Sequence, residues 1–156
     1  MRITLYAVGG NKFSFLREGE GEYLRRLAHY TDIRIVQARE ERHSAAMPQD
    51  AVVQKEWESI RKALPESCHL IVLDKRGKTL SSEALAEKIG DLRIRRVPEV
   101  CFAVGGSLGL PDAALKQADF TLSLSAMTFT HDMSRLILLE QLYRSFTILR
   151  GEKYHK

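Results

Sequence analysis

Short apolar runs alternate with amphipathic stretches along the chain. The runs are rich in β-branched and aromatic residues, which is typical of strands, whereas the stretches between them repeat apolar residues at helical spacing. The pattern predicts strands over residues 2–8, 33–37, 69–73, 99–104 and 119–124. It predicts helices over about 15–29, 49–64 and 132–149, one from Ser81 or Ser82 to about Ile89, and a short one after Pro111. The polar stretch 39–47 is expected to be a mobile loop.

This repeated order of strand and helix predicts an α/β fold with a mostly parallel sheet flanked by helices. The run 69–73 is apolar almost throughout, which suits a central strand that is buried on both faces. A chain of 156 residues fits one domain, and no linker, repeat or low-complexity tract divides it. We therefore expect a single domain that spans residues 1–156.

The last helix, DMSRLILLEQLYRSFTIL (residues 132–149), carries apolar residues around much of its circumference. A helix that is apolar on more than one face has to be buried on more than one face. A second subunit is one cover for the additional face, which predicts a homodimer. The alternative is a helix inserted between the sheet and the loops of a single subunit.

The composition of the chain excludes several classes of protein. The chain is 44% hydrophobic and 28% charged, which excludes a disordered protein. It contains no apolar run long enough to span a membrane and no recognisable signal peptide, so we expect a cytoplasmic protein. The net charge of +4 is compatible with a nucleic-acid partner but does not identify one. Cys68 and Cys101 are expected to be reduced core thiols, and no Cys or His spacing predicts a metal site.

Two loops are candidates for binding a ligand. The sequence GGSLGLPD (residues 105–112) follows the fourth strand directly, and its glycines let backbone amides approach a ligand closely. Ligands of open α/β sheets collect at the carboxyl ends of the strands. The segment is therefore either a cofactor loop or a tight turn into a helix. Its spacing matches neither a dinucleotide fingerprint nor a phosphate loop.

The sequence LSLSAMTFTH (residues 122–131) follows the fifth strand and mixes hydroxyl groups with apolar side chains. This mixture suits a pocket for a flat, partly apolar ligand such as adenine. The alternative is an ordinary connection in which Thr130 or Asp132 caps the last helix. His131 is either a ligand contact or a polar residue near a helix start.

Two basic segments remain. Residues 74–78 (DKRGK) are expected to form a charged turn after the third strand, either in contact with phosphate or simply solvated. The tail RGEKYHK (residues 150–156) contains residues that can grip phosphate, stack on a base or move a proton near neutral pH. Composition alone favours a frayed terminus for this tail.

Taken together, several strings resemble the bacterial RlmH family, the ribosomal RNA large-subunit methyltransferases of the SPOUT class. The strings are the opening RITLYAVGG, EYLRRL in the first helix, LD-x-x-GK after the third strand, GGSLGL, LSxMTxxHxxxR, EQLYR and the terminal YHK. They extend over the whole chain, and their combination is highly specific.

The resemblance implies a C-terminal trefoil knot, a homodimer and S-adenosyl-L-methionine as cofactor. It implies methylation at N3 of a pseudouridine in helix 69 of 23S rRNA, within the large ribosomal subunit or the 70S ribosome. A related SPOUT enzyme acting on tRNA, or a non-catalytic ribosome-binding module, is the alternative. The family's cofactor contacts correspond here to Leu73, Gly105, Leu124, Ser125, Ala126, Met127, Thr128 and Phe129.

The resemblance also gives the tail residues Tyr154, His155 and Lys156 a role at the RNA site. We hypothesise that His155, aided by Tyr154, orients the base and accepts its proton, and that Arg144 stabilises developing charge or holds phosphate. A further hypothesis is that the tail serves the partner's active site. Many family members have a proline just before the tail tyrosine, whereas this chain has Lys153, which leaves its tail more flexible.

Overall fold

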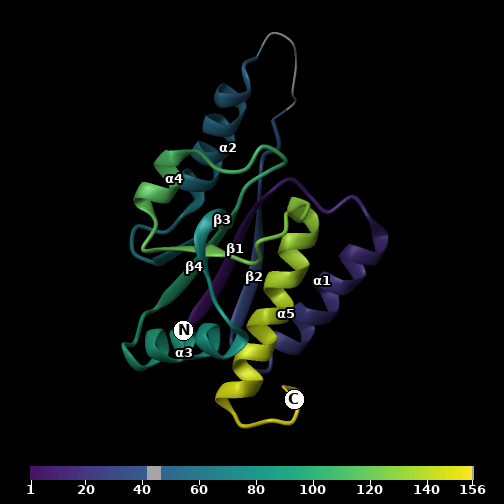
Figure 1. The fold of residues 1–156 in the computed structure, drawn as a ribbon, viewed down its shortest axis with the longest axis vertical. Helices are drawn as coiled ribbons and strands as arrows, with labels where there is room; N and C mark the ends of the chain where they lie inside the picture. The colour runs from purple at the N-terminus through teal and green to yellow at the C-terminus, as the bar shows by residue number, and fades with distance from the viewer. Residues whose placement is uncertain (42–46, 156) are drawn as a thin grey trace.

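Five parallel strands form one sheet in the order β2-β1-β4-β3-β5 (Figure 1). The strands are β1 (Arg2–Val8), β2 (Asp32–Ala38), β3 (His69–Thr79), β4 (Glu99–Val104) and β5 (Phe120–Ser123). This computed structural model describes residues 1–41 and 47–155. Most of the predicted loop 39–47, including His43, and the tail residue Lys156 lie outside the described residues.

Helices connect the strands as the sequence pattern predicts. They are α1 (Ser14–Leu27), α2 (Gln49–Ala63), α3 (Ser82–Ile94), α4 (Asp112–Gln117) and α5 (His131–Leu149). The predicted α/β class with a parallel sheet is therefore confirmed. The trefoil knot and the limits of the domain stay predictions.

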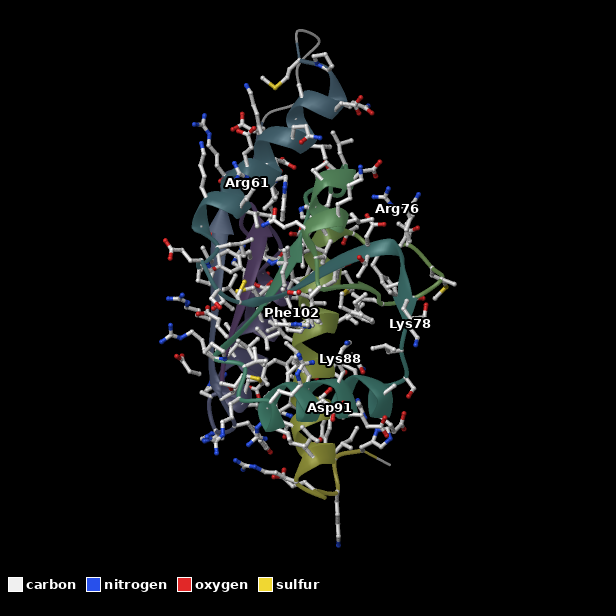
Figure 2. The ribbon with its side chains drawn as sticks, turned by 90° about the vertical axis from the view of Figure 1, so that its left-hand side faces the viewer. Arg61, Arg76, Lys78, Lys88, Asp91 and Phe102 are labelled. Carbon is white, nitrogen blue, oxygen red and sulfur yellow. The ribbon has the colours of Figure 1, made fainter. Side chains whose placement is uncertain are left out.

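Two predicted boundaries are wrong. Residues 74–78 do not form a turn after β3, because the strand continues to Thr79 along β5. Leu73 and Lys78 both lie opposite Leu122, so the residues between them form a bulged arm of the strand. Figure 2 shows Arg76 and Lys78 on this arm, away from Phe102 in the centre of the sheet.

Helix α3 is also longer than expected, since it passes through Gly90 and ends at Ile94. Leu92 is buried on the same side as Leu85 and Ile89, so packing extends the helix by more than one turn. A methyl group at Gly90 would lie 3.0 Å from the side chain of Leu149, which shows how closely α3 and α5 approach there. The glycine thus permits close helix packing and does not end the helix.

The alternation of side chains along the strands creates two apolar layers. In β1, Ile3, Leu5 and Ala7 face one layer, whereas Tyr6 and Val8 face the other. Residues of α1, α3 and α5 complete the first layer, and residues of α2 and α4 complete the second. Strand β4 is buried along its whole length, because it lies between β1 and β3 and is covered on both faces.

Helix α5 packs against both α1 and α3, so one subunit already covers more than one of its faces. This contact supports the alternative interpretation for Leu138, Leu139 and Leu142, which are completely buried. Met133 and Leu149 remain exposed to 36% and 39%. Within the described residues, no helix has the length and apolarity that a membrane crossing requires.

Candidate active site: a cavity at the strand ends and a cluster at the tail

A cavity of about 870 Å³ opens at the carboxyl ends of β4 and β5 and at the point where β3 stops pairing with β4, after Leu73. It lies where ligands of open α/β sheets bind, and its volume suits a small organic ligand. Four segments form most of its wall, namely residues 73–76, 104–110, 122–125 and 127–132. Phe13 closes one side of the cavity from the connection between β1 and α1.

Seven of the eight residues predicted to contact the cofactor line this cavity. They are Leu73, Gly105, Leu124, Ser125, Met127, Thr128 and Phe129. Ala126, the eighth, is exposed and is not part of the wall. The fold thus gathers residues from three separate strand ends, as the sequence predicts, but it leaves Ala126 at the surface.

The glycine-rich loop after β4 is folded tightly on itself. A methyl group at Gly105 would lie 2.4 Å from the carbonyl oxygen of Gly109, and Gly109 has a φ of +80°. The amide of Gly109 donates to the carbonyl oxygen of Gly106 over 3.0 Å. The segment is therefore a tight turn that also forms a wall of the cavity, and its role as a cofactor loop stays a prediction.

The loop after β5 holds its shape through its own hydroxyl groups. The hydroxyl of Ser123 donates to the carbonyl oxygen of Ser125 over 3.1 Å, and the amide of Met127 donates to Ser125 Oγ over 2.9 Å. Thr130 caps α5 by accepting a hydrogen bond from the amide of Met133. Of the two caps considered, Thr130 is the one that the structure contains.

Two polar residues in the first turn of α5 also line the cavity. The Nε2 atom of His131 lies 3.4 Å from Asp132 Oδ1. That oxygen is buried and has no hydrogen-bond partner in the described part of the chain. An unsatisfied buried carboxylate oxygen is costly, and a positive charge in the adjacent cavity would stabilise it through space.

Arg76 joins two of the loops that form the cavity. Its guanidinium donates to Asp74 Oδ1 over 2.8 Å and to Asp112 Oδ1 over 2.6 Å. Burial alone would raise the pKa of Asp74, but hydrogen bonds from the Arg76 side chain and backbone lower it overall. The bulged arm of β3 is therefore attached to the start of α4.

A buried ion pair anchors the first turns of α5. The side chain of Arg135 is 1% exposed, and its Nε atom lies 2.9 Å from Glu20 Oε1 of α1. Arg135 also donates to the carbonyl oxygen of Gly9 over 3.1 Å. These contacts fix the start of α5 relative to α1 and to the end of β1, beside the cavity.

The three predicted catalytic residues form a second cluster, at the other end of α5. The Nη1 atom of Arg144 lies 3.5 Å from His155 Nδ1, and its guanidinium lies 4.7 Å from the ring centroid of Tyr154. The hydroxyl of Tyr154 donates to Glu140 Oε1 over 3.1 Å, and Arg144 donates to the same oxygen over 3.1 Å. Burial, followed by the hydrogen bond with Tyr23, raises the pKa of Tyr154, so its phenol stays protonated.

The tail is packed and not frayed up to His155. The ring of Tyr154 meets the ring of Tyr143 edge to face, with 4.7 Å between centroids. Tyr30, three residues after the end of α1, donates a hydrogen bond to Glu152. Figure 1 shows the tail at the end of the molecule where α3 lies, away from α4.

The tail cluster does not line the cavity of its own chain. Arg144 lies thirteen residues beyond His131 on the same helix, so the two lie roughly 20 Å apart at 1.5 Å per residue. Within one chain, the predicted cofactor contacts thus lie in one group and the predicted catalytic residues lie in another, distant group.

Sequence reasoning missed two carboxylates of the tail cluster, Glu140 and Glu83. Glu140 stands four residues before Arg144, and this helical spacing is the signal that indicates the pair. Glu83 lies in the first turn of α3, with its Oε1 atom 2.7 Å from His155 Nε2. No local pattern connects Glu83 to a residue 72 positions away. Among the described residues, no group of three His, Cys, Asp or Glu side chains is placed to hold a metal ion.

Solved structures described as probable methylases or methyltransferases share this fold. A probable methyltransferase from Bordetella pertussis Tohama I matches with a TM-score of 0.57, covering 93% of this chain and 96% of that chain at 13% identity. A probable methylase family protein from Haemophilus influenzae Rd KW20 matches with a TM-score of 0.53, covering 99% of this chain and 70% of that chain at 14% identity. At such identities the likeness concerns the fold alone.

Closer relatives match over the full length. The chain is 46% identical to "Ribosomal RNA large subunit methyltransferase H" of Acetivibrio thermocellus and 47% identical to the protein of that name from Symbiobacterium thermophilum, with 100% of both chains covered in each case. A family profile described as "Predicted SPOUT methyltransferase" matches residues 1–155. These matches confirm the resemblance inferred from the sequence motifs, and the chain belongs to the SPOUT methyltransferase family.

Proposed function

We propose that this protein uses S-adenosyl-L-methionine to methylate N3 of a pseudouridine in helix 69 of 23S rRNA, within the large ribosomal subunit. The observation that carries the proposal is the cavity at the strand ends, which gathers seven of the eight residues expected to hold the cofactor. The names of the full-length relatives support ribosomal RNA as the substrate. Such a protein would work in the cytoplasm.

The chemistry of the cavity wall supports this cofactor. Leu124, Met127 and Phe129 offer apolar surface to an adenine ring, and the close-packed glycines at 105–109 bring backbone groups to the wall. The unsatisfied Oδ1 atom of Asp132 favours a cationic ligand over an anionic one. When bound, S-adenosyl-L-methionine would supply a methyl group activated by its sulfonium.

The tail cluster would supply the groups that act on the base, which the cavity of the same chain does not contain. His155 would accept the proton from N3 of the base, Tyr154 would orient the base, and Arg144 would stabilise the negative charge that develops on the ring. Reacting atoms have to come within about 3–3.5 Å of each other. Because the cluster and the cavity of one chain are far apart, we infer that the tail of one subunit completes the cavity of its partner.

An apolar rim beside the cavity supports such a homodimer. We define this rim as Phe13, Phe15, Met127 and Met133, which are 57%, 60%, 71% and 36% exposed. The rings of Phe13 and Phe15 are in contact, with 5.8 Å between their centroids. Exposed side chains of this kind at a cavity are typical of a surface that another protein covers.

Mixed dimers test the composite site. The His155→Ala chain lacks the tail group, and a Gly105→Leu chain has its cavity filled, so each homodimer should be inactive. Mixing the two chains should produce heterodimers with one intact site and restore roughly a quarter to a half of the activity. The absence of rescue, with mixed dimers demonstrated by mass spectrometry, would contradict a tail that acts in the partner's site.

A second experiment tests the substrate. Large subunits that lack the modification, prepared with and without prior pseudouridine formation, are incubated with the protein and cofactor, and their RNA is digested for nucleoside mass spectrometry. We expect N3-methylpseudouridine only in subunits that already contain pseudouridine, and little product in free rRNA. Methylation of tRNA, or no methylation of any RNA, would overturn the proposed substrate.

A further inference from the structure

The side chain of His155 is held at both ring nitrogens, although it is the penultimate residue of the chain. Its Nε2 atom lies 2.7 Å from Oε1 of Glu83, in the first turn of α3. The side chains of His155 and Glu83 are 30% and 55% exposed, so the contact lies at the surface and solvent reaches it. An ordinary surface pair of this kind contributes little to stability.

The contact at the other ring nitrogen, Nδ1, indicates which nitrogen of the neutral ring carries the hydrogen. Nη1 of Arg144 lies 3.5 Å from His155 Nδ1. A guanidinium can only donate hydrogen bonds, so Nδ1 has to be the acceptor. The hydrogen of the neutral ring then sits on Nε2 and is donated to Glu83. The two neighbours thus favour the same tautomer from opposite sides of the ring.

Charged and polar side chains from three segments surround the His155 ring. They are Glu83 from α3, Arg144 and Glu140 from α5, and Tyr154 from the tail. The backbone amide of Glu83, then the Ser81 hydroxyl, then His155 lower the pKa of the Glu83 carboxyl, so it is ionised at neutral pH. Arg144 is attached to Glu140, which restrains it beside Nδ1.

We propose that Glu83 is a positioning residue that holds His155 in the tautomer with hydrogen on Nε2, so that Nδ1 is the atom that accepts the substrate's proton. The inference rests on the proposed function in one respect, the role of His155 as proton acceptor. It adds a residue from α3 that no sequence motif indicated. A carboxylate that orients an imidazole in this way works as the aspartate does in serine hydrolases.

When the base binds, the hydrogen bond from Arg144 Nη1 to His155 Nδ1 opens and frees the lone pair of Nδ1. The N3–H bond of the base then breaks, and its proton forms a new bond to Nδ1. The electron pair stays on N3, where it would bond to the methyl group that a bound S-adenosyl-L-methionine supplies, with the sulfur as the leaving group. Glu83 stabilises the imidazolium through Nε2, and Arg144, beside the accepting atom, stabilises the negative charge on N3 before the new bond is complete.

The tautomer can be measured without any reaction. The full-length protein is labelled with ¹⁵N-histidine, and the ring nitrogens of His155 are identified by their loss in the His155→Ala variant. At mildly alkaline pH we expect hydrogen on Nε2 alone in the wild type and a mixture of tautomers in Glu83→Ala. Glu87→Ala, an exposed change one turn further along α3, should leave the spectrum unchanged. A Glu83→Ala spectrum identical to that of the wild type would overturn the proposal.

Methyl transfer to unmodified large subunits provides the second measurement. We expect Glu83→Ala to lower kcat by about tenfold with little change in KM or in the melting temperature, and Glu83→Gln to retain more activity because its amide oxygen can still accept from Nε2. Altered tautomers with an unchanged kcat would also overturn the proposal. Full activity of His155→Ala would instead contradict the proposed role of His155, whatever Glu83 does.

Discussion

Glu56 is a carboxylic acid buried beneath the glycine-rich loop. Its residue exposure is 4%, and one oxygen accepts a hydrogen bond from the backbone amide of Glu41 over 3.2 Å. A methyl group at Gly106 would lie 2.8 Å from the other oxygen. Burial raises the pKa of Glu56 above the usual 4.5, and the charges of Glu40 and Glu41 add to the effect.

The sign of this shift gives a pH-dependent prediction. The folded protein keeps the proton of Glu56 to a higher pH than the unfolded chain does, so the associated stability is present at low pH and is lost as pH rises through the folded-state pKa. We expect Glu56→Gln to melt at a higher temperature than the wild type at neutral pH. The difference should shrink as pH falls towards 4.5.

Calorimetric melting curves across this pH range check the prediction. Glu58→Gln, an exposed change on the same helix, should show no comparable gain at neutral pH. If Glu56→Gln were less stable than the wild type at neutral pH, its carboxylate would have a favourable partner that the described residues do not supply.

Gly77 is constrained by a lack of space for a side chain. It lies in the bulged arm of β3, and an added Cβ would be 2.6 Å from the carbonyl oxygen of Thr121 in β5. Because backbone atoms cannot move aside as a flexible side chain can, we expect Gly77→Ala to lose about 1–3 kcal/mol of stability. Cofactor affinity should fall with it, since the arm forms part of the cavity wall.

Gly21 is the matched control. A methyl group there would meet nothing within 4 Å, and the residue lies inside α1. Gly21→Ala should gain about 0.5–1 kcal/mol from helix propensity. Chemical denaturation of both variants provides the comparison, and a Gly77→Ala protein as stable as Gly21→Ala would show that the arm moves away from β5 without cost.

At the scale of elements, the pair Arg135–Glu20 joins α5 to α1. Removing one partner of a buried pair leaves an uncompensated charge, so we expect Arg135→Met to cost about 3–5 kcal/mol. The double variant Arg135→Met, Glu20→Gln should lose less than the two single changes added together. Urea denaturation of the four proteins measures this coupling.

An exposed ion pair on α1 is the control that separates the effect of burial on stability from the effect of ion pairing itself. Arg25 lies 2.6 Å from Glu22, with side chains that are 72% and 37% exposed. Arg25→Met should therefore change stability by no more than about 1 kcal/mol. Equal losses for Arg25→Met and Arg135→Met would mean that the burial of Arg135 has no energetic consequence.

The elements were largely predictable because each follows from a local pattern. The residues Ile3, Leu5 and Ala7 alternate with Tyr6 and Val8, and this alternation predicts a strand covered on both faces whatever lies around it. The wrong boundaries have non-local causes. Residues 74–78 are polar and contain a glycine, which favours a turn, but β5 pairs with Lys78 and Thr79 from more than forty positions away, and the strand resumes there.

The site was predictable to the extent that it consists of strand ends and motifs. Gly105 and residues 124–129 follow strands directly, so a parallel sheet brings them to one edge. The contact of Glu83 with His155 and the fold of the tail onto Tyr143 depend on how α3 and α5 pack. No pattern of neighbouring residues specifies that packing, and composition alone predicted fraying for the tail.

At the scale of the whole molecule, the separation of cavity and tail makes the assembly testable. We expect Phe15→Glu and Met133→Glu to give monomers, because each puts a charge on the apolar rim that a partner would cover. Methyl transfer should fall by about a hundredfold or more, since the reacting groups would no longer share one site. Light scattering measures the assembly state, and circular dichroism checks that the chain remains folded.

Ile94 offers the control for this experiment. It is 81% exposed at the end of α3, outside the apolar rim. Ile94→Glu should keep both the assembly state and the activity of the wild type. Active monomers of either rim variant would contradict a composite site.

The order of the strands also has a consequence for synthesis on the ribosome. Strand β1 pairs with β2 and with β4, so Leu5 is opposite Ile35 on one side and Phe102 on the other. Strand β1 is made well before β4, so it waits with one edge unpaired until β4 has been made. Such non-local pairing slows folding and prolongs the exposure of apolar edges. The nascent chain thus needs protection from aggregation for longer than its small size suggests.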